Sequence, residues 1–334
     1  MTIKDLAART GYAVGTVSRA LNNHPNVSDT ARRTILKAAE ECGFELNVNA
    51  KQLKQQYSNT ILVLIKGIAN ELFAEMLESI QTLIARTRYD LSVDYMDEDM
   101  NEVTRAVQLC REKKPRGLLF LGGNRANFIK DFGKIDLPAV LVTSDASDLP
   151  FPNLSSVSTD DLEAARCAID TLISLGHRRI AVIGGHRQIS DTSRLRYEGC
   201  LRSFQTHGID FDPLRDYQGV RFSCQDGYEA TKALLASGRK YTAIFAVADV
   251  MAIGAIRALW ESGKRVPEDV SVMGVDGLPL GMYLVPQLST ISQSVGKIAM
   301  RSVEILLDTM ETGAPAVHET VPFAVHKRES IRQI

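Results

Sequence analysis

The sequence predicts an all-α head at the N-terminus and an α/β body of two lobes, each a parallel sheet flanked by helices. Three observations support this class. Residues 1–45 carry helical patterns without strand signals, residues 46–59 are polar and amide-rich, and strands alternate with helices from residue 60 onward. Near-continuous apolar strands between amphipathic helices are typical of parallel sheets that are covered on both faces.

Length and composition limit the class of protein. The chain has 334 residues, enough for two or three domains, and its 45% hydrophobic and 24% charged residues are usual for globular proteins. We find no signal peptide and no apolar run of transmembrane length, so we expect a cytoplasmic protein with no membrane partner. The five cysteines include no CxxC, and we expect neither a disulfide frame, nor a metal, nor a cofactor.

Charge is distributed unevenly along the chain. Residues 1–58 contain eight Lys or Arg against five Asp or Glu, a net charge of +3, and the remainder carries −4 because the whole chain has −1. A modestly basic head on an acidic body is compatible with nucleic-acid binding by the head.

The head is expected to contain three short helices. Thr2 can cap the first helix, and Gly11 ends it because glycine readily takes a positive φ. The second helix carries the apolar stripe Val17, Ala20 and Leu21. Ser28 caps the third helix, whose inward-facing residues are expected to be Ile35, Leu36, Ala38 and Ala39. Three such helices around one small core predict a helix-turn-helix domain.

Seven short apolar runs predict the strands of the body. They cover residues 61–65, 91–95, 117–121, 139–143, 180–183, 244–247 and 270–275. Helical patterns lie between them, for example at 73–86, 162–175 and 249–262. The region is too long for one small sheet, so we expect two similar lobes with a ligand cleft at the carboxyl ends of the strands.

The resemblance to a known family rests on several quoted segments. TIKDLAARTGYAVGTVSRALNN, VSDTARRTILKAAEECGF and NAKQL match, in order and spacing, the head of the lactose-repressor (LacI/GalR) family of bacterial transcription regulators. GHRRIAVIGG, DVMAIGAIRALWESGKRVPEDVSVMGVDG, LSTISQ and VHKRES are similar to that family's body. The resemblance covers nearly the whole chain. It implies a sequence-specific DNA-binding regulator, expected to be a repressor, with a small-molecule effector bound in a periplasmic-binding-protein-like body.

The resemblance also implies a domain organisation. Residues 1–45 would form the helix-turn-helix domain, 46–59 a hinge helix and linker, and 60–334 the body that binds effector and dimerises. The N-lobe would comprise about 60–158 and 292–322, and the C-lobe about 159–291 and 323–334. No leucine heptad follows VHKRESI, so we expect a homodimer formed through surfaces near 73–86 and 249–262.

The resemblance assigns DNA contacts to the second helix and the hinge. The recognition helix would enter the major groove of a pseudo-palindromic operator, with Val14 and Gly15 at specificity positions and Arg19 on guanine or, alternatively, on phosphate. The hinge, too short to hold a helix alone, would fold on the minor groove and insert Leu53, unless Leu53 packs on its own subunit. The predicted DNA-binding residues are Val14, Gly15, Thr16, Ser18, Arg19, Asn22, Asn47, Ala50, Lys51 and Leu53.

Two features of the recognition helix are unusual. Ala13 stands where a capping side chain is expected, which forfeits about 1 kcal/mol. Gly15 lies inside the helix and costs roughly 0.5–1 kcal/mol relative to alanine. We interpret Gly15 as a groove-facing position at which the missing side chain allows close approach to the bases.

Matches to the family's pocket give the candidate effector residues. Phe73 and Phe222 would be stacking faces or ordinary core residues. Arg196 would be a hydrogen-bond donor to the ligand and Asp276 an acceptor, and an interlobe ion pair is the alternative for both. Asp249 could equally be a plain N-cap. The predicted effector-binding residues are Phe73, Asp191, Thr192, Arg196, Phe222, Asp249 and Asp276.

Departures from the family pattern bear on the effector. Thr143 and Ala248 stand where sugar-sensing members often carry a carboxylate and an asparagine, and Lys66 places a cation where a proline is common. A sugar or sugar derivative remains the expected effector, with a nucleobase-like, phosphorylated or acidic ligand or a protein co-effector as alternatives. An enzyme is the remote alternative, because no GxGxxG, P-loop or HExxH motif occurs.

Overall fold

The computed structural model describes residues 3–21, 27–42, 58–67 and 70–334, with side chains from residue 5 onward. The chain divides into two compact units, Met1–Tyr57, here called the head, and Ser58–Ile334, the body.

The described part of the head contains three helices, α1 (Ile3–Thr10), α2 (Val14–Leu21) and α3 (Asp29–Glu41). As predicted, Gly11 ends α1: its φ is 73°, and its N–H donates to the carbonyl of Ala7 at 3.0 Å. All three helices contribute to one small core, whose buried residues are Leu6, Ala7, Val17, Ala20, Ala31, Ile35 and Ala39.

The third helix confirms one prediction and corrects another. Ser28 caps α3, because its Oγ accepts the N–H of Ala31 at 3.4 Å. Ile35 and Ala39 are buried, whereas Leu36, predicted to face inward, is 45% exposed. Residues four apart share one helix face, so Ile35 and Ala39 fill the inner face and Leu36 is rotated toward solvent.

The first lobe of the body is built on a six-stranded parallel sheet with the order β11-β5-β4-β3-β1-β2. Its strands are β1 (Thr60–Lys66), β2 (Asp90–Met96), β3 (Gly117–Leu121), β4 (Ala139–Val142), β5 (Leu154–Ser158) and β11 (His318–Thr320). Its helices are α5 (Glu71–Ile84), α6 (Glu102–Lys113), α7 (Arg125–Asp131), η1 (Phe132–Lys134) and α13 (Val295–Thr312).

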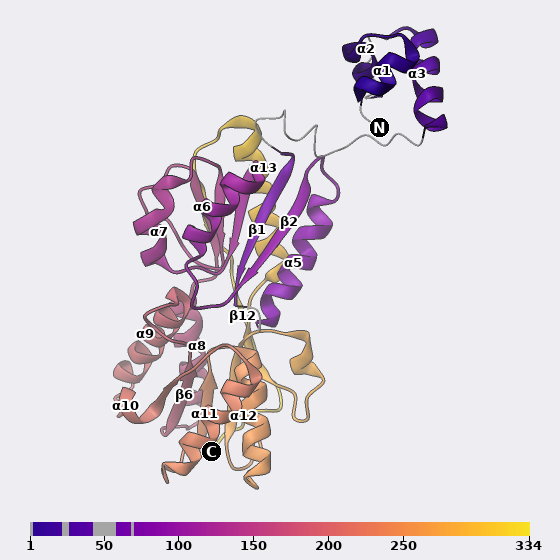
Figure 1. Ribbon diagram of the computed structural model, residues 1–334. Helices are drawn as coiled ribbons and strands as arrows, with labels where there is room; N and C mark the ends of the chain where they lie inside the picture. Colours follow the sequence, from indigo (N-terminus) through magenta and orange to yellow (C-terminus); the bar gives the residue numbers. More distant parts are fainter. Residues whose placement is uncertain (1–2, 22–26, 43–57, 68–69) are drawn as a thin grey trace. The chain divides into compact units, whose positions relative to one another are not determined.

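Alternating side chains of β1 explain why both faces of this sheet are covered. Ile61, Val63 and Ile65 belong to the apolar cluster that contains residues of α5 and α13. Leu62 and Leu64 belong to a separate cluster with residues of α6 and α7. Successive residues of a strand point to opposite faces, so a continuous apolar run requires helices on both sides, as Figure 1 shows.

The second lobe has a six-stranded sheet with the order β12-β10-β9-β8-β6-β7, parallel except for the antiparallel pair β10–β12. Its strands are β6 (Ile180–Gly184), β7 (Tyr217–Gly219), β8 (Ala243–Ala246), β9 (Ser271–Asp276), β10 (Ser289–Ser292) and β12 (Ala324–His326). Its helices are α8 (Asp161–Ser174), α9 (Asp191–Thr206), α10 (Pro213–Asp216), α11 (Cys224–Ala236), α12 (Asp249–Glu261) and η2 (Pro279–Met282).

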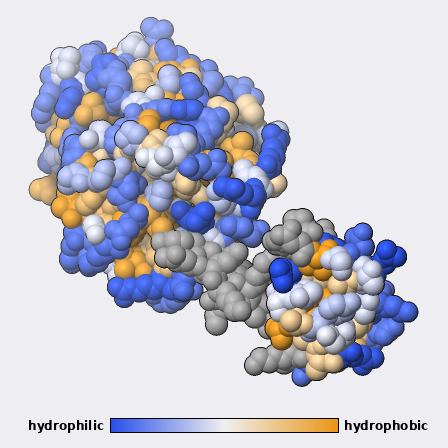
Figure 2. Space-filling view, turned by 90° about the horizontal axis from the view of Figure 1, so that it is seen from above, coloured by the Kyte–Doolittle hydropathy of each residue, from blue (hydrophilic) through white to orange (hydrophobic). Residues whose placement is uncertain are grey.

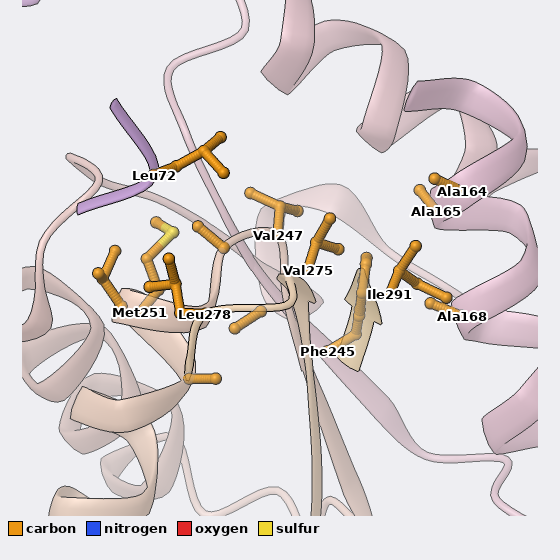
Figure 3. Packing of buried hydrophobic residues seen from close by; sticks show 14 of the residues in the cluster. Leu72, Ala164, Ala165, Ala168, Phe245, Val247, Met251, Val275, Leu278 and Ile291 are labelled. Atoms are coloured by element: carbon orange, nitrogen blue, oxygen red, sulfur yellow. The ribbon is translucent and has the colours of Figure 1, made fainter. Parts of the chain in front are cut away.

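Helices also cover both faces of the second sheet. Figure 3 shows Ile291 of β10 directed toward the small residues of α8, including Ala168, whereas Met251 of α12 and Leu278 lie on the other side of the strands. The small side chains of α8 allow this helix to pack closely on the sheet.

The seven apolar runs predicted as strands form β1, β2, β3, β4, β6, β8 and β9. The face of the body in Figure 2 is largely hydrophilic, with apolar residues scattered over it. Among the described residues, no helix combines the length and the apolar character needed to cross a bilayer.

Candidate functional sites

A cavity of about 280 Å³ lies between the two lobes of the body. Its wall contains Lys66 and Thr143, at the carboxyl ends of β1 and β4, and Asp276, at the carboxyl end of β9. Five of the seven predicted effector residues line it, namely Phe73, Thr192, Arg196, Phe222 and Asp276. Its volume is close to the lower end of the ~300–1,000 Å³ common for small-molecule sites.

Arg196, from α9, is the centre of a buried polar network beside this cavity and is only 3% exposed. Its Nε donates to Asp161 Oδ1 at 2.8 Å, its Nη1 donates to the carbonyl of Val247, and the same Nη1 lies 3.5 Å from Asp276 Oδ1. Burial alone would lower the pKa of Arg196, but the two carboxylates raise it above its ordinary value. The guanidinium is therefore a fixed cation.

Asp276 combines backbone strain with burial. Its φ is 120°, and Thr143, with a φ of 74°, is a second non-glycine residue in this sparsely populated region that lines the same cavity. Such strain persists where the surrounding structure over-determines it, often at ligand sites. Gln293 Nε2 donates to Asp276 Oδ1 at 2.8 Å. Burial raises the pKa of Asp276 to about 6, although Arg196 opposes the shift.

The two predicted stacking residues, Phe73 and Phe222, each pack against a glycine that directly follows a strand. A Cβ at Gly122 would lie 3.1 Å from Phe73 Cζ, and a Cβ at Gly185 would lie 2.6 Å from Phe222 Cε2. A Cβ at Gly185 would also clash with Ser193 Oγ, so glycine is needed where these two side chains approach the backbone. These contacts place one aromatic ring from each lobe in the cavity wall.

Lys66 lines the cavity, but it does not add a free cation to it. Its Nζ lies 2.6 Å from Oε2 of Glu102, a fully buried carboxylate at the start of α6. Glu102 also accepts from the backbone N–H of Asn124 at 2.6 Å and from Asn127 Nδ2 at 2.9 Å. The extra cation expected from the sequence is thus neutralised by a carboxylate that sequence reasoning did not identify.

An ion cluster joins the two lobes at the cavity. The Nη1 and Nη2 atoms of Arg221 each lie 3.0 Å from a carboxylate oxygen of Asp97, and its Nε lies 3.4 Å from Glu98 Oε1. Arg221 Nη2 also donates to Asp99. Arg221 follows β7 in the second lobe, whereas the three acidic residues follow β2 in the first lobe.

Asp191 and Asp249 are the two predicted effector residues that do not line the cavity. Asp191 Oδ2 accepts the backbone N–H of Arg125 at 2.6 Å, and its Oδ1 lies 3.3 Å from Arg194 Nη2. It therefore ties the second lobe to the start of α7 in the first lobe.

Asp249 is fully buried next to the loop that follows β9, which contains Leu278. It is the first residue of α12, but the N-cap is Ala248. Asp249 Oδ1 accepts from Thr290 Oγ1 at 2.7 Å, and Oδ2 accepts from the N–H of Leu278 at 2.8 Å. Burial, reinforced by Asp276, raises the pKa of Asp249 to about 8.

The raised pKa of Asp249 predicts a pH-dependent stability. A carboxyl whose pKa is higher in the folded state stabilises most below its unfolded pKa of ~3.9, and this contribution is lost as pH rises through about 8. Asp249→Asn can still accept from Leu278 and can donate to Thr290. We therefore expect it to flatten the decline of the melting temperature between about pH 4 and 8.

Thermal unfolding across this pH range measures the effect. Asp210→Asn is the matched control, because Asp210 lies in the same lobe with a side chain that is 87% exposed. If Asp249→Asn and Asp210→Asn follow the wild-type pH profile equally, the raised pKa of Asp249 is refuted.

On the head, α2 exposes part of the predicted DNA-binding surface. Val14 is 42% exposed, Gly15 and Arg19 are exposed, and Arg19 Nε donates to the carbonyl of Gly15 at 3.2 Å. Thr16 and Ser18 are half-buried. The other predicted DNA-binding residues lie outside the described residues: Asn22, Asn47, Ala50, Lys51 and Leu53.

An apolar groove opens on the second lobe beside α12. Its lining includes Trp260 and Val285, which are 66% and 95% exposed. The guanidinium of Arg257 lies 4.7 Å from the ring centroid of Trp260. Large exposed apolar patches with a polar rim are typical of protein–protein interfaces. The part of its lining that α12 supplies, including Arg257 and Trp260, belongs to the region 249–262 expected from the sequence to mediate dimerisation.

In the part of the chain that the structure describes, no three His, Cys, Asp or Glu side chains gather into a group that could hold a metal ion.

Comparisons with known proteins place these features in context. Residues 2–47 match the family model "Bacterial regulatory proteins, lacI family", and residues 169–331 match "Periplasmic binding protein-like domain". The chain is 32% identical to the HTH-type transcriptional regulator MalR of Clostridium butyricum, over 99% of both chains. It is also 32% identical to the probable HTH-type transcriptional repressor ExuR of Bacillus subtilis, over 100% of this chain and 99% of that protein.

A solved structure agrees over the same length. The Lac repressor dimer bound to operator and the anti-inducer ONPF is 26% identical, with a TM-score of 0.82, and the match covers 99% of each chain.

Proposed function

Because the chain belongs to the LacI family of bacterial transcriptional regulators, we propose that it binds a pseudo-palindromic operator as a homodimer, under control of a small molecule held between its lobes. The named relatives are transcriptional regulators rather than enzymes. The observation that carries the proposal is the cavity walled by polar and aromatic residues of both lobes, in a chain that also has a helix-turn-helix head.

We assign the reading of DNA to the exposed side of α2. In a helix-turn-helix, the second helix lies in the major groove with its N-terminal residues on base edges. Val14 would contact a thymine methyl and Arg19 a guanine, while Thr16, Ser18 and Asn22 would contact phosphates. The resemblance assigns Asn47, Ala50 and Lys51 to the minor groove and makes Leu53 the wedge that kinks it.

The effector is assigned to the interlobe cavity. Arg196 and Asp276 would orient polar groups of the ligand, Phe73 and Phe222 would cover its faces, and Thr192 would add a hydroxyl partner. Asp191 and Asp249 take supporting positions, since neither lines the cavity. A sugar or sugar derivative suits this combination of hydrogen-bonding groups and aromatic faces. A ligand that prefers one degree of lobe closure would shift the population toward it and so change operator affinity.

Gly15→Ala tests the reading face of α2. A Cβ at Gly15 would meet nothing within 4 Å in the described structure, so alanine should stabilise the head by about 0.5–1 kcal/mol through helix propensity. If Gly15 faces the groove, the same variant loses or changes operator preference. Chemical unfolding and competition binding measure the two effects. A gain in stability with unchanged preference would make Gly15 merely a weak point of the helix.

Val285→Glu tests the dimer surface. Placing a charge in the groove beside Trp260 should prevent two copies from burying it, and analytical ultracentrifugation should then find a monomer. Operator affinity should fall by roughly 10²–10⁴-fold, because the two half-sites are no longer bound by one linked unit. Leu214→Glu is the control, since Leu214 is 96% exposed on α10, outside the groove. A Val285→Glu dimer with normal operator affinity would refute this interface.

Selection of binding sites from random DNA tests the function as a whole. The purified protein should enrich a pseudo-palindrome of roughly 14–20 base pairs, because the two heads of a dimer read half-sites about one helical turn apart. Recovery of sequences without twofold symmetry would contradict the proposal.

A further inference from the structure

The charges around the interlobe cavity are strongly unbalanced. Its described lining contains three permanent cations, Lys66, Arg196 and Arg221, and one histidine, His186. The carboxylates in the lining are Asp97, Glu98, Asp226 and Asp276. Three further carboxylates that do not line the cavity also bind these cations, namely the buried Glu102 and Asp161 and the exposed Asp99. Seven carboxylates thus surround three cations.

Each of the three cations is already bound to carboxylate. Lys66 pairs with fully buried Glu102, and Arg196 lies between Asp161 and Asp276. Arg221 is shared among three acidic side chains of the first lobe. Within the described wall, an incoming carboxylate or phosphate would therefore meet only cations whose charge a protein carboxylate already neutralises.

The carboxylates, in contrast, retain acceptor capacity toward a ligand. Asp226 is bonded by the Ser223 hydroxyl and lines the cavity without a basic partner among the described residues. Burial raises the pKa of Glu98 above its ordinary value despite Arg221, and it raises the pKa of Asp276 despite Arg196. In both carboxyls the effect of burial outweighs that of the neighbouring arginine.

We propose that this cavity selects against anionic ligands, and that its effector carries no carboxylate or phosphate and binds by donating hydroxyl or amino groups to the wall carboxylates. This inference rests on the proposed function, since it takes the cavity to be the effector site. It excludes the phosphorylated and acidic effectors that the sequence left open. A like charge at contact distance in a partly buried site weakens binding by a factor on the order of 100 or more.

Ligand-induced thermal shifts of the full-length protein test the charge preference directly. The probes are matched sets on one framework: D-glucose, D-glucosamine and D-glucuronate, and the corresponding galactose and mannose sets. In any set that stabilises the protein, we expect the neutral or amino member to bind at least ~100-fold more tightly than the acid. An acid that is the tightest member of its set would overturn the proposal.

Inorganic phosphate, compared with chloride at equal ionic strength, provides a second test that does not depend on the choice of sugar. If phosphate stabilises the protein at all, we expect this stabilisation not to depend on the cations of the cavity. The proposal is overturned if phosphate stabilises the wild type and this shift is lost in Lys66→Met or Arg221→Gln but kept in Arg194→Gln. A shift retained in all three variants arises outside the cavity and agrees with the proposal.

Operator binding, measured on the same preparations, separates the two levels of inference. Failure to bind a selected palindrome counts against the proposed regulator, whatever the charge of the preferred ligand. Normal operator binding together with cavity-dependent anion binding counts against the charge selectivity alone.

Discussion

Arg196→Met is expected to destabilise the body by about 3–5 kcal/mol and to abolish the effector response, while operator binding persists in protein that remains folded. Arg196 is the cation of a buried network, and its loss leaves Asp161 and Asp276 without their counter-charge. Both carboxyls must then be protonated or remain buried as unpaired charges, which is costly in either case. Urea unfolding measures the stability, and operator binding with and without effector measures the response.

Arg194→Met is the matched control for this variant. Arg194 lies on the same helix, but its side chain is 41% exposed and pairs with Asp191 and Glu198 at the surface. Partly exposed pairs contribute about 0–1 kcal/mol, so the control should unfold nearly as the wild type does. Equal stabilities and equal effector responses in the two variants would refute the assigned role of Arg196.

Ile35→Ala is expected to abolish operator binding by unfolding the head. Ile35 is fully buried in a core of seven residues, and truncating a buried isoleucine to alanine costs about 2–5 kcal/mol. A domain of this size rarely has more than ~3–5 kcal/mol of stability, so the loss should unfold much of the population. The body is a separate compact unit and should keep its effector-induced thermal shift.

Leu36→Ala provides a control one residue away. Leu36 is 45% exposed, so the same kind of truncation should change stability by no more than about 0.5 kcal/mol. Circular dichroism and operator binding compare the two variants. If both variants lose operator binding, burial in the core does not decide the effect. Leu36 would then contact DNA or a neighbouring subunit.

The fold could be predicted well where the pattern is long and periodic. Apolar runs identified the central strands because strands buried on both faces need apolar side chains at successive positions, as in β1. Five of the described strands were missed. The interior strands β5 (LSSVS) and β10 (STIS) consist mainly of serine and threonine, so they form no apolar run. The three-residue strands β7, β11 and β12 have partly exposed residues and too few positions for a pattern.

Only part of the candidate site could be predicted from the sequence. The match to family motifs identified Arg196 and Asp276, because each stands in a recognisable segment. It could not identify Glu102, since its bond to Lys66 joins residues 36 positions apart that no motif connects. It also could not separate Asp249 from the residues that line the cavity, because Asp249, like Asp276, lies near the carboxyl end of a strand. Only the approach of Thr290 and Leu278 buries the carboxyl of Asp249.

Operator affinity as a function of salt, on the selected palindrome and on a scrambled duplex, tests the central claim most directly. For a regulator that makes about 6–10 phosphate contacts, affinity should fall by roughly 10³–10⁵ between about 50 and 200 mM salt. At fixed salt, the palindrome should bind at least ~10³-fold more tightly than the scrambled duplex. A shallow salt dependence with equal affinity for both duplexes would contradict sequence-specific regulation by this chain.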